Sequence, residues 1–450
     1  RVNKDKKMEL EPMELEPKEL EELPSITEQP PQPPPQPPPQ PPQQVEKIKL
    51  TSNETSIVLE GLEKLEKEER ETGVLSKENR KNKNKLLNKK EIYNRILLEK
   101  STTPNFLFPN KDDPNFNIKL IEKKEFQVLE KKRVKNYDDL EKLTEEACNQ
   151  RIFELLSHQI FVKNFLSFQT PYNSLLLYHG LGTGKTCSAI SICEEMRDYL
   201  KQVNSGSKIL IIASPNVQEN FKLQLANFKK LENIKGIWNL NACTGNKYLK
   251  EINPMNMRGL SKEEIKKLIT NLINKSYTFM GYEQFSNYIE KIVNKFIPGN
   301  ATNNEKIKIR KRVLKQKFSN SLIVVDEVHN LRSELTSEKK VSNNLFDVAK
   351  YSTNLKLLLL SATPLFNSPR EIVWILNLMN VNDGRATISE KNLFDKNDNL
   401  LVDEDTGELN GKELLQRKIT GYVSYLRGES PLSFPFKLFP LSFMRKNTLE

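Results

Sequence analysis

The stretch LLLYHGLGTGKTCSAI, residues 175–190, joins an apolar run, a glycine-rich turn and an amphipathic segment. A strand, a tight loop and a helix start in this order are typical of a phosphate-binding loop, in which backbone N–H groups and the helix dipole face the anion. His179 stands where the usual template has its first glycine. Because this position ends the strand and precedes the cradle, we expect phosphate binding to be retained.

The residues of the loop have separate expected roles toward a bound nucleoside triphosphate. Gly180, Gly182 and Gly184 allow the backbone to turn sharply and to point its N–H groups inward. Lys185 should reach the β- and γ-phosphates, and the Thr186 hydroxyl should ligate Mg²⁺. With the motifs described below, the residues expected to hold ATP are Gln159, Gly180, Leu181, Gly182, Thr183, Gly184, Lys185, Thr186 and Asp326.

A second motif, LIVVDEVHN at residues 322–330, places acidic side chains after another apolar run. Because the carboxyl ends of parallel strands share one edge of a sheet, Asp326 and Glu327 are expected beside the phosphate loop. Asp326 suits the Mg²⁺ shell, and Glu327 suits the general base that orients the attacking water. An exposed acidic turn would explain either carboxylate alone, but it does not easily explain the D-E-V-H set. The two motifs together predict hydrolysis of a nucleoside triphosphate.

Short apolar runs without polar alternation recur along the middle of the chain. They occupy residues 174–179, 208–214, 277–282, 321–327 and 355–363. Runs of this kind are typical of parallel strands that are buried on both faces, and amphipathic segments lie between them. The sequence therefore predicts an α/β fold with a doubly wound parallel sheet and helices on both faces.

The first 90 residues are expected to be a disordered tail without a core. They contain an acidic repeat, a tract with ten prolines in thirteen residues (30–42) and the basic run KENRKNKNKLLNKK (77–90). The proline tract suits a polyproline II spacer or a docking peptide for an aromatic groove. The basic run suits a solvated segment or an electrostatic aid to nucleic-acid binding.

Composition predicts further boundaries downstream of the tail. Residues 91–150 are expected to pack on an α/β lobe at 151–384, and residues 385–450 are expected to form a linker. A helical, basic insertion is expected at about 230–318, because the interval between the two nucleotide motifs is long. Within it, the run KIKIRKRVLKQK at 306–317 suits either a solvated helix face or a basic surface on a nucleic-acid path.

Bulk composition narrows the class of protein. The net charge of +11 favours an acidic partner such as nucleic acid. No C-x-x-C pair occurs among Cys148, Cys187, Cys193 and Cys243, so we expect reduced thiols rather than disulfides or a zinc site. No apolar run approaches the ~18 residues that a membrane-spanning helix needs, and no secretion signal is visible at the charged N-terminus.

Three shorter motifs add candidate contacts. Ser361 and Thr363 follow an apolar run and suit hydrogen bonds to the acidic motif or to His329, although Thr363 alone would also suit a helix cap. Ser214 begins a segment that offers hydroxyl and N–H groups to a nucleic-acid phosphate. Gln159 has the donor and the acceptor that reading an adenine edge requires.

In this order the motifs resemble the first RecA-like lobe of a superfamily 2 helicase. They are more similar still to helicases of nucleocytoplasmic large DNA viruses, in the group of the poxvirus early transcription factor small subunit and nucleoside triphosphatase I. The stretches that carry the resemblance are DDPNFNIKLIEKKEF, HQIFVKNFLSFQTPYNSLLLYHGLGTGKTCSAI, ASPNVQENFKLQL, SATPLFNSPREIVWILNLM and GYVSYLRGESPLSFPFKLFP. The resemblance covers roughly residues 105–440.

The resemblance implies a RecA-like P-loop NTPase lobe that moves along DNA or RNA with ATP and Mg²⁺, often during viral transcription. It further implies a second RecA-like lobe, a viral RNA polymerase as a partner, and a location in the host cytoplasm, viral factory or virion. The positions that match the family's catalytic motifs are Lys185, Glu327 and His329. The matching coupling positions are Ser361, Ala362 and Thr363, and the matching nucleic-acid positions are Ser214, Pro215 and Asn216.

The sequence departs from the family pattern in one respect. The family's second lobe carries an arginine finger in a late arginine-rich motif, and we find no such motif before Glu450. The finger is worth ~10³–10⁵ in rate, so we expect this chain alone to bind Mg·ATP and to hydrolyse it weakly. The alternative to a helicase or translocase is a transcription-factor subunit that ATP switches and that binds nucleic acid without unwinding it.

Overall fold

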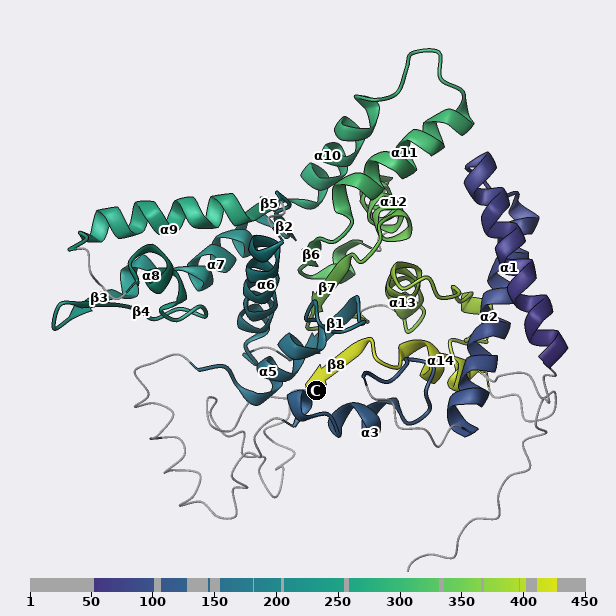
Figure 1. Ribbon diagram of the computed structural model, residues 1–450, viewed down its shortest axis with the longest axis horizontal. Helices are drawn as coiled ribbons and strands as arrows, with labels where there is room; N and C mark the ends of the chain where they lie inside the picture. Colours follow the sequence, from purple (N-terminus) through teal and green to yellow (C-terminus); the bar gives the residue numbers. More distant parts are fainter. Residues whose placement is uncertain are drawn as a thin grey trace, which may run out of the picture. The chain divides into compact units, whose positions relative to one another are not determined.

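A parallel sheet of six strands forms the centre of the described chain (Figure 1). The computed structural model describes residues 52–100, 107–127, 145, 154–180, 182–203, 206–254, 259–331, 336–365, 368–395, 397–401 and 411–426. Neighbouring strands of this sheet all run parallel. In sheet order they are β5 (Tyr277–Met280), β2 (Ile209–Ile212), β6 (Leu322–Val325), β7 (Lys356–Ser361), β1 (Ser174–His179) and β8 (Val423–Leu426).

Helices cover both faces of this sheet (Figure 1). One core contains residues of α5 (Ser157–Phe165), α6 (Lys185–Gln202), α7 (Pro215–Leu225), α8 (Lys247–Ile252) and α9 (Lys262–Ser276). The other contains residues of α10 (Tyr282–Asn294), α11 (Asn303–Phe318), α12 (Thr336–Tyr351) and α13 (Glu371–Asn382). Leu176 and Leu177 belong to opposite cores and are both fully buried. The predicted α/β fold, with each predicted run forming a strand, is confirmed.

The predicted helical insertion differs from the structure in two ways. The region about 230–318 contributes β5 to the main sheet, and it also holds an antiparallel hairpin of β3 (Leu231–Ile234) and β4 (Ile237–Leu240). The hairpin turns at Lys235 and Gly236, whose φ angles are 50° and 82°. Two residues with positive φ form the tight turn that suits the twist of paired strands.

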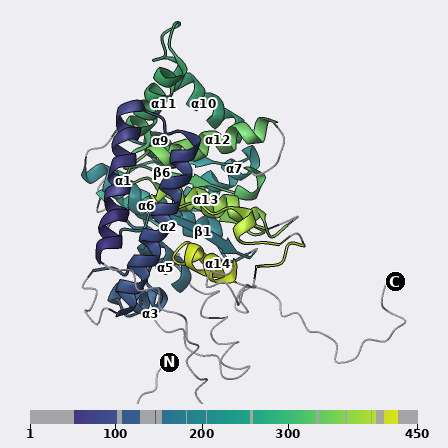
Figure 2. The same cartoon turned by 90° about the vertical axis from the view of Figure 1, so that its right-hand side faces the viewer.

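The predicted disordered tail is wrong for residues 52–90, whereas residues 1–51 lie outside the described part. Two helices, α1 (Ser52–Thr72) and α2 (Lys77–Lys100), lie side by side (Figures 1 and 2). Val58, Leu62 and Leu75 are buried. Polar contacts also join the helices, because the Asn79 amide donates to the Glu68 carboxylate and Lys83 pairs with Glu69 at 2.8 Å.

The predicted linker at 385–450 also contains ordered structure, although residues 402–410 and 427–450 lie outside the description. Helix α14 spans Gly411–Ile419, and β8 after it pairs with β1 along Leu176–His179. The Tyr422 side chain just before β8 is fully buried. Upstream, α3 (Phe116–Ile121) contributes Phe116, which packs edge-on against Tyr172 with ring centroids 5.5 Å apart.

A buried charge cluster joins α2 to α14. Glu91 is 5% exposed, and its carboxylate accepts hydrogen bonds from Arg417 at 2.9 Å, from Lys418 at 2.6 Å and from the Ala386 N–H at 2.8 Å. Burial lowers the pKa of Lys418 to about 8, against the opposing effect of Glu91. A second contact joins α2 to the same region, because the Asn84 amide exchanges hydrogen bonds with the Thr387 backbone. These contacts explain why α2 is docked although its sequence is strongly polar.

The expectation of four reduced thiols is wrong for one pair. Cys187 in α6 and Cys243 form a disulfide with Cα atoms 5.3 Å apart, while Cys193 is a buried free thiol and Cys148 lies outside the described residues. The two cysteines are 56 positions apart in sequence, so no local spacing pattern predicts the disulfide. Within the described ranges, no cluster of side chains suits a metal ion by ligand count, and no helix is long and apolar enough to cross a membrane.

The Glu91 cluster generates a prediction about stability. Glu91→Ala leaves two buried cations without their carboxylate, so the free energy of unfolding should fall by ~3–5 kcal/mol. Urea unfolding followed by circular dichroism measures this change. Glu63→Ala, at an exposed position of α1, is the matched control and should change stability by less than ~0.5 kcal/mol. Equal losses in the two variants would show that the cluster does not hold α2.

Candidate functional site

Three strands of the sheet end at the same carboxyl edge. The register places Tyr178 of β1 beside Ser361 of β7, and Leu359 of β7 beside Val325 of β6. The glycine loop follows β1 and the acidic motif follows β6, with β7 between them. The structure therefore brings together the two motifs that lie about 140 residues apart in sequence.

The glycine loop has the backbone conformation of a phosphate cradle. Gly182 and Gly184 have φ angles of 74° and 79°, and α6 begins at Lys185 directly after them. The positive φ at position 184 strains any other residue, and a Cβ atom there would lie 2.5 Å from the Gln159 amide nitrogen, which would have to move. Thr183 holds the turn, because its hydroxyl donates to the Gly180 carbonyl at 2.8 Å. Leu181, also expected to contact ATP, lies outside the described residues.

Lys185 lies across the loop and within electrostatic reach of the acidic motif. Its ammonium donates to the His179 carbonyl at 2.8 Å, and the Gly180 carbonyl lies 3.4 Å away. Burial lowers the pKa of Lys185, and the charges of Glu327 and Asp326 oppose that shift. Thr186 follows in the first turn of α6 and is partly exposed. Both residues lie in the first turn of α6, where the helix N-terminus favours an anion.

Asp326 and Glu327 are two carboxylates in a partly dehydrated site. Asp326 is 8% exposed, and burial, followed by the charge of Glu327, raises its pKa to about 6. Burial also raises the pKa of Glu327, which Lys185 and the Ala362 N–H oppose. Glu327 has a φ of 47°, in the left-handed region that non-glycine residues rarely adopt. Such strained backbone is concentrated at functional sites.

A hydrogen-bonded network joins the ends of β6 and β7. The His329 Nδ1 atom lies 2.9 Å from the Ser361 hydroxyl and 3.2 Å from a Glu327 carboxylate oxygen. The Ser361 hydroxyl also accepts the Thr363 N–H at 3.1 Å. Glu327 is therefore in contact with the strand that carries the expected coupling residues Ser361, Ala362 and Thr363.

The side chains of Gln159 and His158 contact the backbone of the glycine loop. The Gln159 side chain is 3% exposed, accepts the Leu156 N–H at 2.9 Å and donates to the Gly184 carbonyl at 3.2 Å. Both ends of its amide are engaged within the protein, and its reading of adenine remains a prediction. The His158 Nε2 atom contacts the Thr183 carbonyl at 2.9 Å.

His179 joins the loop to β8. Its ring is fully buried, and the Nε2 atom lies 2.9 Å from the Ser424 hydroxyl. Burial, then the neighbouring His158 and Lys185, lowers its pKa to about 4, so the ring is neutral at physiological pH. Beside it, the Gly180 N–H donates to the Leu426 carbonyl at 3.1 Å. Strand β8 was not predicted, because it is short and its residues do not form an uninterrupted apolar run.

The expected nucleic-acid residues lie at the same carboxyl edge, after β2. Ser214 is the N-cap residue of α7, and Pro215 occupies the first helical position. Ser214 is partly exposed, while Pro215 and Asn216 are exposed. Solvent can therefore reach all three residues, and their contact with nucleic acid stays a prediction.

Sequence reasoning missed Tyr282. This residue opens α10, directly after β5, and its hydroxyl donates to the Asp326 carbonyl at 2.7 Å. A side-chain hydrogen bond also joins it to Asn330, and burial raises its pKa to about 12. Its position as the last residue of a predicted strand run, at the edge that carries the other motifs, was the available signal. Tyr282 thereby connects the edge strand β5 to the acidic motif across β2.

The residues present fit Mg·ATP. The backbone at Gly184 disfavours a side chain, the helix N-terminus favours an anion, and Lys185 supplies a positive charge. Hydroxyl and carboxylate oxygens, as offered by Thr186 and Asp326, are the ligands that Mg²⁺ prefers. The raised pKa of Asp326 also fits, because a cation would stabilise the charge that burial disfavours.

Comparison with known proteins gives one domain and several viral relatives. The sequence profile of the SNF2-related domain matches residues 158–416. "Putative ATP-dependent RNA helicase L377" of Acanthamoeba polyphaga mimivirus is 28% identical over 362 residues, which cover 75% of this chain and 28% of that protein. "Putative helicase 087L" of Invertebrate iridescent virus 3 is 28% identical over 294 residues, which cover 63% of this chain and 24% of that protein.

A further relative is named for transcription. The "Early transcription factor large subunit homolog" of African swine fever virus is 21% identical over 330 residues, which cover 64% of this chain and 28% of that protein. Its name refers to a large subunit, whereas the motifs resemble the poxvirus small-subunit group. The chain spans about a quarter to a half of the length of the first relatives it matches.

The buried Asp326 carboxylate generates a prediction about pH. Its pKa of about 6 in the folded chain lies above its ordinary value of 3.8, so the folded state holds this proton more tightly than the unfolded state. The stability that the protonated Asp326 carboxyl contributes to the metal-free fold is fully present below about pH 3.8 and is lost as the pH rises through about 6. Asp326→Asn should raise the free energy of unfolding by roughly 1–3 kcal/mol at pH 8, and the gain should vanish at pH 3.5.

Urea unfolding at both pH values in EDTA measures the Asp326→Asn effect. Asp347→Asn, at a partly exposed position of α12, is the control and should not show a pH-dependent gain of this size. A gain for Asp326→Asn that persists at pH 3.5 would mean that relief of a buried charge is not its cause.

Proposed function

This chain belongs to the SNF2-related domain family, and from that premise we propose that it is the ATP-binding lobe of a viral ATP-dependent nucleic-acid translocase or helicase. Membership in a family of ATPase and helicase domains implies hydrolysis of a nucleoside triphosphate. The expected resemblance to helicases of large DNA viruses is confirmed. The substrate polymer, the direction of movement and the coupling to transcription belong to the proposal.

One observation carries the proposal: the glycine loop and the D-E-V-H motif meet at one edge of the sheet. Lys185 and the two carboxylates are close enough for their charges to shift one another's pKa. A site built only to bind a nucleotide needs the lysine and the cradle. A site that also hydrolyses the nucleotide needs a carboxylate that can orient water, and Glu327 has this chemistry.

The residues suggest a division of labour in hydrolysis. Lys185 would exchange the His179 carbonyl for phosphate oxygens, and Thr186 and Asp326 would hold Mg²⁺. The cation, when bound, neutralises phosphate charge. Glu327 would accept a proton from the attacking water, since burial raises its pKa toward the range that suits a general base. A second RecA-like lobe, in the same or another chain, would supply the arginine finger.

The network behind Glu327 suggests how nucleotide state is transmitted. His329 contacts both Glu327 and Ser361, so a change at the γ-phosphate position reaches the end of β7 through one imidazole. Ser214, Pro215 and Asn216 stand at the same edge and would contact the backbone of DNA or RNA. Closure of two lobes around ATP would then move the polymer.

A second candidate is a transcription-factor subunit that ATP switches and that binds nucleic acid without unwinding it. The African swine fever virus relative favours it, because that protein is named for early transcription. The two candidates share the ATP site and differ in strand separation. Nucleic-acid-stimulated ATPase with duplex unwinding supports a helicase, and stimulation without unwinding supports a translocase or a switched subunit. A viral RNA polymerase, and residence in the host cytoplasm, viral factory or virion, fit either candidate.

The roles of Lys185 and Glu327 can be separated experimentally. Lys185→Ala should weaken binding of Mg·ATP by at least tenfold, because the main phosphate charge partner is lost. Glu327→Gln should retain binding within about threefold and reduce turnover by ~10²-fold or more. Fluorescent-nucleotide titration and phosphate release on the full chain measure the two effects. Unchanged turnover in Glu327→Gln would rule out this residue as the general base.

Tyr282 gives a prediction about coupling. Tyr282→Phe removes the donor to the Asp326 carbonyl and should lower kcat of the nucleic-acid-stimulated ATPase several-fold, with the KM for ATP changed by less than twofold. Tyr288→Phe on the same helix is the control. A parallel rise in KM would indicate a role in ATP binding instead of in positioning the acidic motif.

A further inference from the structure

Four lysines form one row on the surface of α2, and the row is inclined to the helix axis. Lys77, Lys81, Lys85 and Lys89 recur at every fourth position and are all exposed. With a rise of 1.5 Å per residue, successive members of the row are about 6 Å apart along the helix axis, and the row covers about 18 Å of that axis. We call these four residues the lysine stripe.

The lysine stripe disfavours the helix that carries it. Like charges four residues apart destabilise a helix by ~0.2–0.5 kcal/mol per pair, and the stripe contains three such pairs. Lys77 also lies in the first turn, where the helix dipole disfavours a cation. Within the described ranges, no carboxylate forms an ion pair with any lysine of the stripe. A neighbouring lysine behaves differently, because Lys83 pairs with Glu69 of α1.

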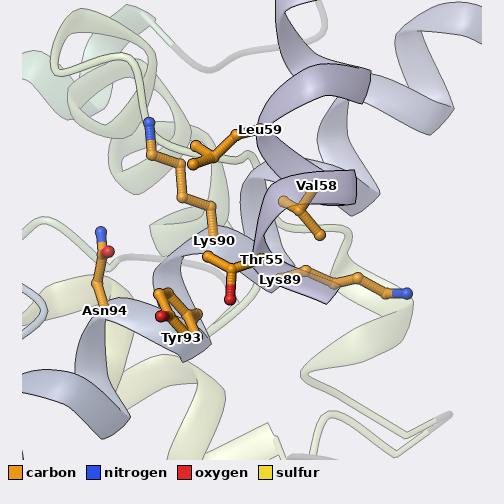
Figure 3. Close-up of a pocket in the computed structure, with 7 residues that line it drawn as sticks. All are labelled: Thr55, Val58, Leu59, Lys89, Lys90, Tyr93 and Asn94. Atoms are coloured by element: carbon orange, nitrogen blue, oxygen red, sulfur yellow. The ribbon is translucent and has the colours of Figure 1, made fainter. Parts of the chain in front are cut away.

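Other side chains of α2 attach the helix to the rest of the described chain. Asn79 and Lys83 face α1, while Asn84 and Glu91 contact the region of α13 and α14. Figure 3 shows the cavity of about 70 Å³ that Lys89 lines together with Val58 and Tyr93. The ammonium of Lys89 points away from these side chains (Figure 3). The stripe is therefore a set of charges on a docked helix and is directed to solvent.

We propose that the lysine stripe binds the sugar–phosphate backbone of a nucleic acid, as a contact outside the SNF2-related domain. The matched domain begins at residue 158, about seventy positions beyond Lys89. The proposal deepens the proposed function, because it adds a second contact for the polymer on which the ATP site would act. The stripe holds the polymer near the lobe while the ATP site passes through its cycle.

Charge and spacing favour nucleic acid over an acidic protein segment. Phosphates recur about every 3.4 Å along one duplex strand, so the stripe spans about five of them. No exposed large apolar side chain lies between Lys77 and Lys89, whereas a docked peptide would need apolar anchors. Contacts to phosphates carry no base information, so binding at the stripe is independent of sequence.

The test is the salt dependence of binding by the full chain. A variant with K77Q, K81Q, K85Q and K89Q is compared with wild type by fluorescence anisotropy on a mixed-sequence DNA duplex without nucleotide. The plot of log K against log salt has a negative slope, and each lost phosphate contact reduces the magnitude of that slope by ~0.9. We expect the magnitude of the slope to decrease by roughly 2–4 and the affinity at 0.1 M salt to fall at least tenfold.

The matched control has four exposed lysines of α9 replaced: K262Q, K266Q, K267Q and K275Q. It removes the same net charge and should change the slope by less than one. Equal changes in slope and affinity in the two variants would show that net charge alone explains the loss, and this result would overturn the proposal. An unchanged slope in the stripe variant would also overturn it and would leave an acidic protein as the partner to test.

Two further measurements keep the outcomes distinct. The midpoint of thermal unfolding should stay unchanged or rise in the stripe variant, because like-charge repulsion is removed, so lost affinity cannot result from unfolding. Lys185→Ala should lose ATP binding and keep the wild-type salt slope. If wild type does not bind DNA or RNA at all, the proposed function fails. If wild type binds nucleic acid and the stripe variant binds it with the same salt slope, the inference about the stripe fails while the proposed function stands.

Discussion

The interaction on which the site depends is the one between Lys185 and the carboxylates of Asp326 and Glu327. Two adjacent acids in a partly dehydrated place repel each other, and burial disfavours the charge of each. A cation from the glycine loop offsets this cost only because the sheet brings both loops to one edge. The parallel topology is therefore what lets the loop cation reach both carboxylates, and in the proposed mechanism Mg²⁺ would supply the remaining positive charge.

The same edge connects the site to the rest of the lobe through a few polar contacts. His329 joins Glu327 to β7, Tyr282 joins Asp326 to the region of β5, and His179 joins the glycine loop to β8. Each contact joins the end of one strand to another part of the same edge. A change in nucleotide state would thus reach three neighbouring elements by hydrogen bonds, without any large motion inside the sheet.

Segments outside the predicted lobe are attached by buried charge. Glu91, Arg417 and Lys418 come from distant parts of the chain and satisfy one another in a dry place. Such a cluster adds little net stability over apolar packing, but removal of one member is costly. The cluster favours the observed register of α2, because Glu91 satisfies both cations only in that register. Residues 52–90, which were expected to belong to a disordered tail, instead form most of a helical pair.

The sequence by itself determined the strands, the glycine cradle and the acidic motif, because apolar runs, glycines and the residues after a strand end are local properties. It also gave Ser361 two candidate partners, the acidic motif and His329, and the structure shows the contact with His329. Only the tertiary structure decided that Gln159 supports the cradle, that Tyr282 holds Asp326, that Cys187 pairs with Cys243, and that α2 and β8 belong to the fold. These features depend on partners far away in sequence, and a contact between distant residues leaves no pattern in either local stretch.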